Sequence, residues 1–377
     1  MSNSQLNLED FDYHLPQDLI AQHPARNRDE SRMLVIDRET GRLIDDDFRN
    51  FPQYLQPDDL VVLNNSRVIP ARLFGHRLGT SAQPIGKTNP ARHEYLKSEI
   101  EVLLIRQLDP RTWEALVKPG RKVGIGERII FHKSDVEIGP SEIPCPSLEA
   151  EVIGRGDFGL RTLRFPEGIA LAEAIEALGH IPLPPYISRP DSADDRIRYQ
   201  TVFAKQNGSV AAPTAGLHFT PEILEMIASR GVELAEITLH VGLGTFQPIH
   251  EDKIDLHRMH PEFYEIDPNA ANRLNRENRG NRRLIAVGTT TVRTLEHVAA
   301  KNNGRIKAER GETELFIRPG FEFRVTGGLL TNFHLPRTTL LMLVCAFAGR
   351  EITLAAYERA VRNRYRFYSY GDCMLIL

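Results

Sequence analysis

The chain has 377 residues, of which 41% are hydrophobic and 26% charged, and its formal net charge is -3 at pH 7. This composition is typical of a globular protein and excludes a disordered one, while the length favours two domains over one. The charge balance excludes a uniformly basic nucleic-acid-binding protein, so any contact with RNA would depend on local arginine clusters.

Residues 1–5 are polar and precede no apolar segment, so the sequence predicts no signal peptide. The most apolar segment, Leu340–Gly349, is too short to span a bilayer and predicts a buried helix. Cys145, Cys345 and Cys373 are far apart, which favours neither a disulfide framework nor an iron–sulfur cluster. We therefore expect a cytoplasmic protein with reduced thiols and no membrane contact.

Residues 60–166 consist of short β-rich segments separated by glycine-containing turns, with no helical pattern between them. Such a series predicts a small barrel or a sandwich. Residues 79–99 are polar and contain proline and glycine, so we predict a long mobile loop there.

After residue 190 the pattern changes to strands followed by helices. Val210–Ala212 predicts a strand, and a helix follows with Thr220 as its N-cap and Pro221 in its first turn. Glu233–Val241 and Arg283–Gly288 predict two further strands, the second followed directly by a helix. The alternation predicts a mostly parallel sheet or a partial barrel, with the loops after the strands gathered at one edge.

Three histidines stand at predicted strand ends: His218, His240 and His334. His334 follows Asn332 by two positions. A core position explains any one of them, but the three together favour at least one in a working site. Imidazole titrates near neutral pH and is suited to proton transfer.

Three shorter motifs are candidate ligand sites. The segment GLGTF, residues 242–246, has only a G-x-G pattern, so a tight turn explains it better than a dinucleotide site does. Thr289–Thr291 stand at a predicted helix start, which suits a carboxylate or a phosphate. His257 and His260 lack the HExxH pattern and a cysteine partner, so we predict no metal site.

Arginines are concentrated in two regions, residues 272–283 and the last predicted helix. A solvated helix face and an RNA-binding patch both remain open, because arginine and tyrosine side chains together can hold phosphates and stack on bases. The candidates for RNA contact are Arg26, Arg28, Arg32, Arg67, Arg72, Arg359, Arg362 and Arg366.

Several long motifs occur in one order from about residue 10 to the C-terminus. They include LVVLNNSRVIPARLFG, YQTVFAKQNGSVAAPTAGLHFT, LHVGLGTFQPI, VGTTTVRTLE, TNFHLPRTTLLMLV and YRFYSYGDCMLI. Together they closely resemble the S-adenosylmethionine:tRNA ribosyltransferase-isomerases of queuosine biosynthesis, with residues 79–99 as the one obvious departure.

The resemblance implies a fold and a reaction. The fold is a larger α/β domain (1–59 and 167–377), described as a modified half-barrel, with an inserted antiparallel β-barrel domain (60–166). The reaction transfers and isomerises the ribosyl moiety of S-adenosylmethionine onto 7-aminomethyl-7-deazaguanine at the tRNA wobble position. Its products are epoxyqueuosine-tRNA, adenine and methionine. S-adenosylmethionine is then a co-substrate with no further cofactor, the anticodon loop of tRNA is the partner, and we expect a monomer.

This chemistry requires a base near C5′ of the ribose, an acid near the departing adenine and an acceptor for the proton of the attacking amine. The predicted catalytic residues are His218, His240, His334 and Asp372. The predicted S-adenosylmethionine-binding residues are Thr214, Gly216, Gly242, Gly244, Thr245, Phe246, Thr289, Thr290, Thr291, Arg293, Asn332, Tyr368 and Tyr370. Within this set, Thr289–Thr291 and Arg293 would hold the methionine carboxylate.

Two alternatives from other classes remain open at this point. A non-catalytic RNA-binding module would explain the arginines but would leave the polar loops after the strands without a role. A conventional methyltransferase is the other alternative, although no GxGxG loop follows an early strand.

Overall fold

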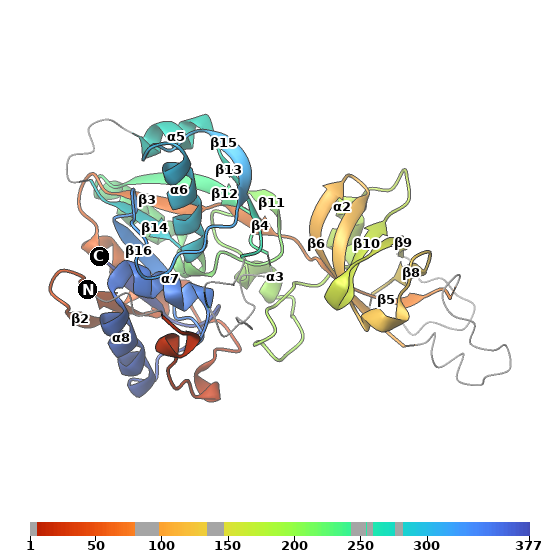
Figure 1. The fold of residues 1–377 in the computed structure, drawn as a ribbon, viewed down its shortest axis with the longest axis horizontal. Helices are drawn as coiled ribbons and strands as arrows, with labels where there is room; N and C mark the ends of the chain where they lie inside the picture. Colours follow the sequence, from red (N-terminus) through yellow and green to blue (C-terminus); the bar gives the residue numbers. More distant parts are fainter. Residues whose placement is uncertain (1–5, 80–97, 134–146, 243–253, 255–258, 276–281) are drawn as a thin grey trace. The chain divides into compact units, whose positions relative to one another are not determined.

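The computed structural model describes residues 6–79, 98–133, 147–242, 254, 259–275 and 282–377. The chain divides into two compact units, which we call the sheet unit and the barrel unit and describe separately (Figure 1). The sheet unit comprises Met1–Arg67, Pro184–Pro190 and Ile197–Leu377, and the barrel unit comprises Val68–Leu183 and Asp191–Arg196. The barrel unit therefore starts after the predicted boundary at 60 and continues past the one at 166.

A nine-stranded sheet forms the centre of the sheet unit. Its strands are β1 (Arg32–Ile36), β2 (Leu43–Asp47), β3 (Leu60–Asn64), β12 (Glu233–Leu239), β13 (Glu262–Ile266), β14 (Leu284–Val287), β15 (Glu309–Thr313), β16 (Gly328–Asn332) and β17 (Cys373–Ile376). Their order is β15-β13-β12-β3-β14-β16-β17-β1-β2. A separate two-stranded sheet pairs β4 (Ser66–Val68) with β11 (Gln206–Ser209).

The sheet is mixed, which corrects the prediction of a mostly parallel one. The middle strands β12, β3, β14 and β16 run parallel. This was predicted for β12, β14 and β16, whereas β3 falls in the range 60–166 predicted for the barrel and belongs to this sheet instead. In contrast, β17 is antiparallel to β16, and the outer strands pair in antiparallel fashion with their neighbours. The difference arises because β1 and β2 follow each other without a crossover helix, and because β17 returns in the opposite direction after two helices. The half-barrel implied by the resemblance stays a prediction.

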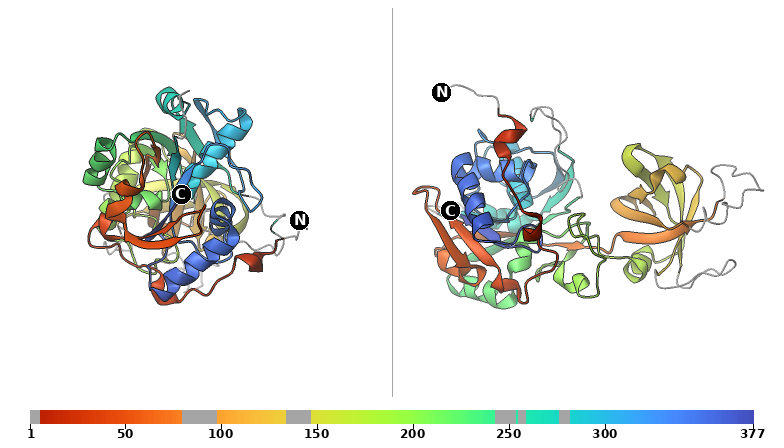
Figure 2. Two further views of the ribbon diagram at one scale, coloured as in Figure 1. Left: turned by 90° about the vertical axis from the view of Figure 1, so that its left-hand side faces the viewer. Right: turned by 90° about the horizontal axis from the view of Figure 1, so that it is seen from below.

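Two hydrophobic cores cover the two faces of this sheet, because side chains alternate along each strand. Leu34 and Ile36 of β1 belong to one core, and Met33 and Val35 belong to the other. The helices of the sheet unit are α4 (Pro221–Ser229), α5 (Pro268–Leu274), α6 (Thr289–Lys301), α7 (Thr339–Ala348) and α8 (Arg350–Arg362). Helices α5 to α8 pack into the first core and α4 packs into the second. The two C-terminal helices, blue in Figure 2, pack against each other.

Short 3-10 helices connect these elements: η1 (Leu8–Phe11), η2 (Gln17–Leu19), η3 (Arg28–Glu30), η4 (Phe48–Tyr54) and η7 (Thr214–His218). Residues Val210–Ala212 form no strand, which corrects that prediction. The predicted start of α4 is confirmed, because Thr220 is its N-cap and accepts a hydrogen bond from the Ile223 amide.

The barrel unit contains a closed barrel in which every neighbouring pair of strands is antiparallel. Its elements are β5 (Arg72–Arg77), β6 (Ile100–Asp109), β7 (Thr112–Lys118), η5 (Gly120–Lys122), β8 (Arg128–Phe131), β9 (Leu148–Arg155), η6 (Asp157–Gly159), β10 (Leu160–Arg164) and α2 (Leu171–Leu178). The short helix α3 (Asp195–Arg198) lies where the chain returns to the sheet unit. The predicted antiparallel barrel is confirmed, whereas residues 80–97 of the predicted loop lie outside the described residues.

No single helix in the described part of the chain is long and apolar enough to cross a membrane. Helices α7 and α8 reach that length and hydropathy only as a pair, and they are bent by 117° at the break between them. The apolar segment beginning at Leu340 forms most of α7 and is largely buried, as predicted.

Candidate functional site

A pocket lies in the sheet unit beside the carboxyl ends of the parallel strands β14 and β16, where ligands bind in open α/β sheets. We call it the strand-edge pocket. Of the residues predicted from the sequence, it is lined by Thr214, Thr289, Thr290, Asn332, His334 and Tyr368. Its open volume is about 40 Å³, far below the ~300–1,000 Å³ that is usual for a small-molecule pocket. A ligand of that usual size therefore needs the lining side chains to move apart.

The start of helix α6 forms one wall of the pocket. Gly288 precedes the helix with a φ of 93°, which only glycine adopts readily, and it provides no side-chain cap. The Thr291 hydroxyl donates back to the carbonyl oxygen of Val287 at 2.7 Å, so it does not face the pocket. The first backbone N–H groups of α6, at Thr289 and Thr290, are thus the ones beside the cavity, where they favour an anion.

The Asn332 side chain is held from one side only. Its Nδ2 lies 3.1 Å from the carbonyl oxygen of Tyr368, 3.5 Å from that of Asp372 and 3.2 Å from Nε2 of His218. A flipped amide would place Oδ1 against the two carbonyl oxygens, so Nδ2 must face them. The opposite atom, Oδ1, is buried and has no hydrogen-bond partner among the described residues. An unpaired buried acceptor beside a cavity is a position where a ligand's hydrogen-bond donor would be stabilised.

His218 is a satisfied core histidine. Because its Nε2 accepts from Asn332, its proton is on Nδ1, which donates to the Ser31 hydroxyl at 2.9 Å. The ring packs against Phe48 with a centroid distance of 5.4 Å, and burial lowers the pKa of His218 to about 3. The imidazole is therefore neutral, both its nitrogens are engaged, and it does not line the strand-edge pocket. It supports Asn332 from behind.

His334 differs from His218 because it lines the pocket itself. Its Nε2 lies 2.9 Å from the Thr331 hydroxyl, and its backbone N–H donates to the Tyr357 hydroxyl. Burial lowers the pKa of His334 to about 3. Within the described residues its Nδ1 has no hydrogen-bond partner. When Nε2–H donates to Thr331, Nδ1 carries a free lone pair beside the cavity.

Two tyrosines form an aromatic wall. The rings of Tyr186 and Tyr368 have centroids 4.0 Å apart, and the Tyr186 hydroxyl shares a hydrogen bond with the hydroxyl of Ser369. Tyr368 has a φ of 73°, a left-handed conformation that is strained for a bulky side chain and is found most often at functional positions. Gln22 holds the Tyr186 segment, since its side-chain amide donates to the carbonyl oxygen of Tyr186 at 2.9 Å.

Two other predicted catalytic residues do not line this pocket. His240 stacks on Phe263, its buried Nδ1 has no partner within the described part of the chain, and burial lowers its pKa. Asp372 is held within the chain instead: its carboxylate accepts from the backbone N–H groups of Arg32 at 3.0 Å and Arg366 at 2.8 Å, and it pairs with the Arg32 guanidinium at 3.3 Å. Burial raises the pKa of Asp372, and its contacts give it the role of an anchor between the start of β1 and the C-terminal segment.

Arg293 is also placed away from the predicted carboxylate site. Its guanidinium forms a buried ion pair with Glu262 and donates to the carbonyl oxygen of Leu315 at 3.0 Å. Several other predicted binding residues are absent from the lining: Gly216, Gly242, Thr291 and Tyr370. Gly244, Thr245, Phe246 and His257 lie outside the described residues. Among the described residues no group of three His, Cys, Asp or Glu side chains is placed to hold a metal ion.

The predicted RNA-binding arginines fall into two groups. Most are engaged within their own unit: Arg28, Arg32, Arg72, Arg359 and Arg366 donate to backbone carbonyl oxygens or pair with carboxylates. The side chains of Arg26, Arg67 and Arg362 are exposed and have no partner among the described residues. Arg366 lies beyond the end of α8, so of the three arginines predicted on the last helix only Arg359 and Arg362 are part of it.

Sequence reasoning missed three residues of the lining that carry a hydroxyl group, Tyr186, Thr331 and Ser369. Thr331 and Ser369 are immediate neighbours of the predicted residues Asn332 and Tyr368. Their position beside these residues is the signal that could have found them. Tyr186 stands in the proline-rich segment HIPLPPYISRP, which has no periodic pattern and so gives no signal for a site.

Comparisons with known proteins identify the family. A family model described as "Queuosine biosynthesis protein" matches residues 8–376. A curated relative from Solibacter usitatus is 54% identical over 99% of this chain and 100% of its own length, and one from Carboxydothermus hydrogenoformans is 49% identical with the same coverage. Both are named S-adenosylmethionine:tRNA ribosyltransferase-isomerase.

A solved structure agrees with these relatives. The crystal structure of an S-adenosylmethionine tRNA ribosyltransferase from Thermotoga maritima is 37% identical and matches 98% of this chain and 100% of its own, with a TM-score of 0.51. The match extends over both units, so the sheet and the barrel are one family architecture. The chain belongs to the queuosine biosynthesis protein family, the family of the S-adenosylmethionine:tRNA ribosyltransferase-isomerases.

Proposed function

We propose that the strand-edge pocket is the S-adenosylmethionine site of a tRNA ribosyltransferase-isomerase. The chain is an enzyme of queuosine biosynthesis that transfers and isomerises the ribosyl moiety of S-adenosylmethionine onto tRNA. The acceptor in this reaction is 7-aminomethyl-7-deazaguanine, and adenine and methionine are released. The observation that carries the activity is the family match over residues 8–376.

The start of α6 is the proposed seat of the methionine carboxylate. The uncapped N–H groups at Thr289 and Thr290 lie beside the pocket, and the partial positive charge of the helix N-terminus favours an anion there. Arg293 has no part in this proposal, because its charge is already neutralised by Glu262. Backbone donors take over the role that the sequence had suggested for the guanidinium.

The tyrosine pair is the proposed contact for the sulfonium. A cation against the face of an aromatic ring gains about 0.5–2 kcal/mol. Tyr186 and Tyr368 both line the pocket, and their ring centroids lie 4.0 Å apart. Separation of these rings is also the simplest way to open the small cavity to a ligand.

Asn332 and His334 are the proposed polar contacts for the reacting part of the substrate. The unpaired Oδ1 of Asn332 suits a donor such as a ribose hydroxyl or an exocyclic amine. His334 is neutral at physiological pH, since its pKa is about 3, and its Nδ1 is free to accept a proton. The sulfonium acidifies the C5′ hydrogens, so a base is needed close to that carbon. An efficient base has a pKa near the working pH, so in this proposal the bound substrate raises the pKa of His334 from its low value in the free enzyme.

The remaining features of the proposal concern the partners. The acceptor base lies at the wobble position of the anticodon loop, where single-stranded RNA can place a base in a pocket at small unstacking cost. Arg26, Arg67 and Arg362 are the proposed phosphate contacts, because their side chains are exposed and free of partners among the described residues. The enzyme is proposed to act as a monomer and to need no cofactor besides its co-substrate.

The test is a comparison of two histidine variants with labelled S-adenosylmethionine and tRNA carrying the aminomethyl base. Formation of adenine and methionine supports the ribosyltransferase, S-adenosylhomocysteine would indicate methyl transfer, and no turnover would leave an RNA-binding module.

His334→Gln should lower kcat by about 100-fold or more, the usual contribution of a positioned base. His218→Gln should retain most of the turnover of its folded fraction. A reversed order of the two variants would exclude His334 as the base.

A further inference from the structure

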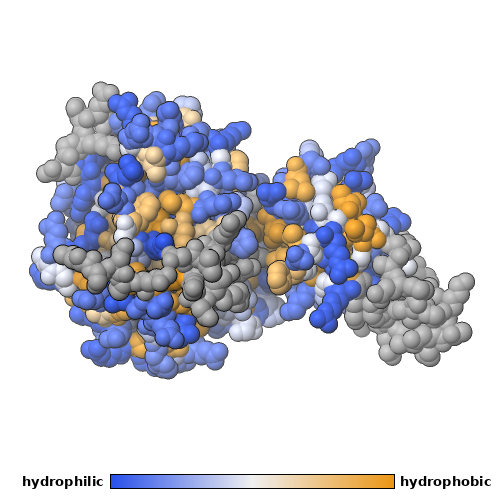
Figure 3. Space-filling model, in the orientation of Figure 1, coloured by the Kyte–Doolittle hydropathy of each residue, from blue (hydrophilic) through white to orange (hydrophobic). Residues whose placement is uncertain are grey.

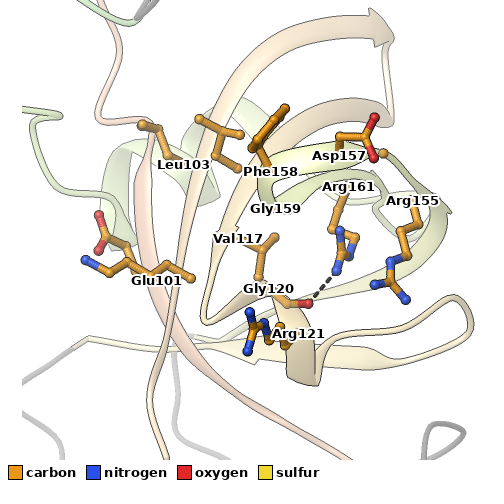
Figure 4. A pocket seen from close by; sticks show the side chains of 13 residues that line it. Glu101, Leu103, Val117, Gly120, Arg121, Arg155, Asp157, Phe158, Gly159 and Arg161 are labelled. Carbon is orange, nitrogen blue, oxygen red and sulfur yellow. Dashed lines mark hydrogen bonds between the residues drawn. The ribbon is translucent and has the colours of Figure 1, made fainter. Parts of the chain in front are cut away.

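A groove on the barrel unit has no role in the proposed reaction site. It has a volume of about 670 Å³ and lies between β6, β7, the end of β9 and the turns η5 and η6 (Figure 4). Its lining includes Lys118, Arg121, Arg155 and Phe158. We call it the barrel groove. On the face of the barrel unit that is visible in Figure 3, hydrophobic and hydrophilic residues lie side by side.

Phe158 is held in an unusual position. Its side chain is 103% exposed, and its φ of 51° is left-handed, which is unfavourable for a bulky residue. The backbone on both sides of Phe158 packs closely: a Cβ at Gly156 would come within 2.9 Å of Leu160, and one at Gly159 within 2.9 Å of the Val117 carbonyl oxygen. Both glycines thus let the backbone pack closely on the barrel while the ring of Phe158 faces solvent. Strain of this kind persists most often where it serves a ligand.

A buried arginine fixes the two turns of the groove to each other. The Arg161 guanidinium donates to the carbonyl oxygens of Val123 and Leu160, each at 2.7 Å, and to that of Gly120 in η5 (Figure 4). The residue is 2% exposed and pairs with no carboxylate of the residues that the structure describes. The groove is therefore a preformed surface in which the position of Phe158 is set by the barrel.

The charged rim of the groove is cationic. Lys118, Arg121 and Arg155 are exposed and have no partner among the described residues. Of the carboxylates in the lining, that of Glu101 is paired with Arg72 at 3.1 Å, which leaves Asp157. Three free cations beside one free carboxylate favour a polyanion.

We propose that the barrel groove binds the tRNA substrate, with the Phe158 ring stacked on an unpaired base and Lys118, Arg121 and Arg155 in contact with the neighbouring phosphates. An exposed aromatic ring set among cations is the arrangement by which proteins hold single-stranded nucleic acid, since every base has a face for stacking. The proposal rests on tRNA being the substrate, and it assigns a binding surface outside the strand-edge pocket.

The first test replaces the ring. Phe158→Ala should raise the Kd of the full chain for substrate tRNA by about 5- to 150-fold, the range for loss of one stacked base. Phe158→Trp should bind as the parent does, whereas Phe158→Leu should behave like the alanine variant, because it keeps the apolar bulk but not the ring. Ile125→Ala, which truncates another exposed apolar residue of the barrel unit, is the matched control and should not change the Kd.

The second test concerns the charges. Arg155→Ala and Arg121→Ala should each reduce the slope of log Kd against log salt by about 0.7, the value for one phosphate contact on a single strand. Arg106→Ala is the control, because Arg106 is exposed on the same barrel but pairs with Glu114 at 3.0 Å outside the groove. The KM for S-adenosylmethionine and the kcat at saturating tRNA should stay at the parent values in every groove variant.

Two results would overturn the proposal. One is an unchanged Kd for tRNA in Phe158→Ala; the other is a change in self-association of that variant in sedimentation, which would assign the ring to a protein interface. Failure of the proposed function is distinguishable, because it would be seen as absence of adenine release by the parent enzyme. The tRNA binding measurements do not depend on turnover and would still decide the role of the groove.

Discussion

Acidification should destabilise this protein through two buried histidines. Burial holds the pKa of both His218 and His334 at about 3, against 6.5 for an ordinary histidine. Between these values the unfolded chain binds the extra proton and the folded chain does not, so the free energy of unfolding falls as the pH falls below 6.5. A change from about pH 7 to about pH 5 should therefore cost about 2 kcal/mol for each histidine.

The contribution of one ring can be separated with His218→Gln. The glutamine does not titrate, yet its amide oxygen can still accept the hydrogen bond from Asn332. Urea denaturation followed by circular dichroism at both pH values gives the loss of unfolding free energy on acidification, and this loss should be about 2 kcal/mol smaller in the variant than in the parent. Ser31→Ala is the control, since it removes the hydrogen bond to Nδ1 but keeps the titrating ring. An equal loss in His218→Gln and in the parent would refute the view that the core holds this imidazole neutral.

Three further outcomes are expected. Asp372→Asn should lower the free energy of unfolding by about 2–3 kcal/mol, because an amide would replace an acceptor of two backbone N–H groups; a neutral result in urea denaturation would exclude the anchoring role. Arg293→Met should cost about 3–5 kcal/mol by leaving its carboxylate partner buried and unpaired, and a raised KM for S-adenosylmethionine without loss of stability would restore the role predicted from the sequence. Arg362→Ala should reduce the salt slope of tRNA binding by about 0.7, whereas Arg359→Ala, which removes a paired arginine, should leave it unchanged; equal slopes would contradict the distinction between free and paired arginines.

Local signals in the sequence predicted local structure well. Thr220 and Pro221 indicated the start of α4 because capping and the fixed φ of proline act within one turn. The strand containing Ala235, Ile237 and Leu239 was evident because its alternation records which face is buried. The alternation of strands and helices also predicted the edge of the sheet at which the pocket lies, because the carboxyl ends of parallel strands meet at one edge.

The partners of buried polar groups could not be predicted, because they depend on pairing between distant segments. Arg293 stands next to three threonines in the sequence, yet its charge is neutralised by Glu262 on β13. His218 was selected for its chemistry, but Ser31 and Asn332, remote from it in the sequence, occupy both of its nitrogens. The Tyr186 segment has no periodic pattern, and only the three-dimensional structure places it beside Tyr368.

The position of β17 has a consequence for biosynthesis. This strand lies inside the sheet between β16 and β1, so a nascent chain that lacks residues 373–376 leaves two strands with unpaired edges. Such edges are sites of aggregation, and contacts between segments so far apart in sequence form slowly. The carbonyl oxygens that orient Asn332 belong to Tyr368 and Asp372, which directly precede this strand. Loss of β17 pairing should therefore open the sheet and release the Asn332 side chain of the strand-edge pocket at the same time.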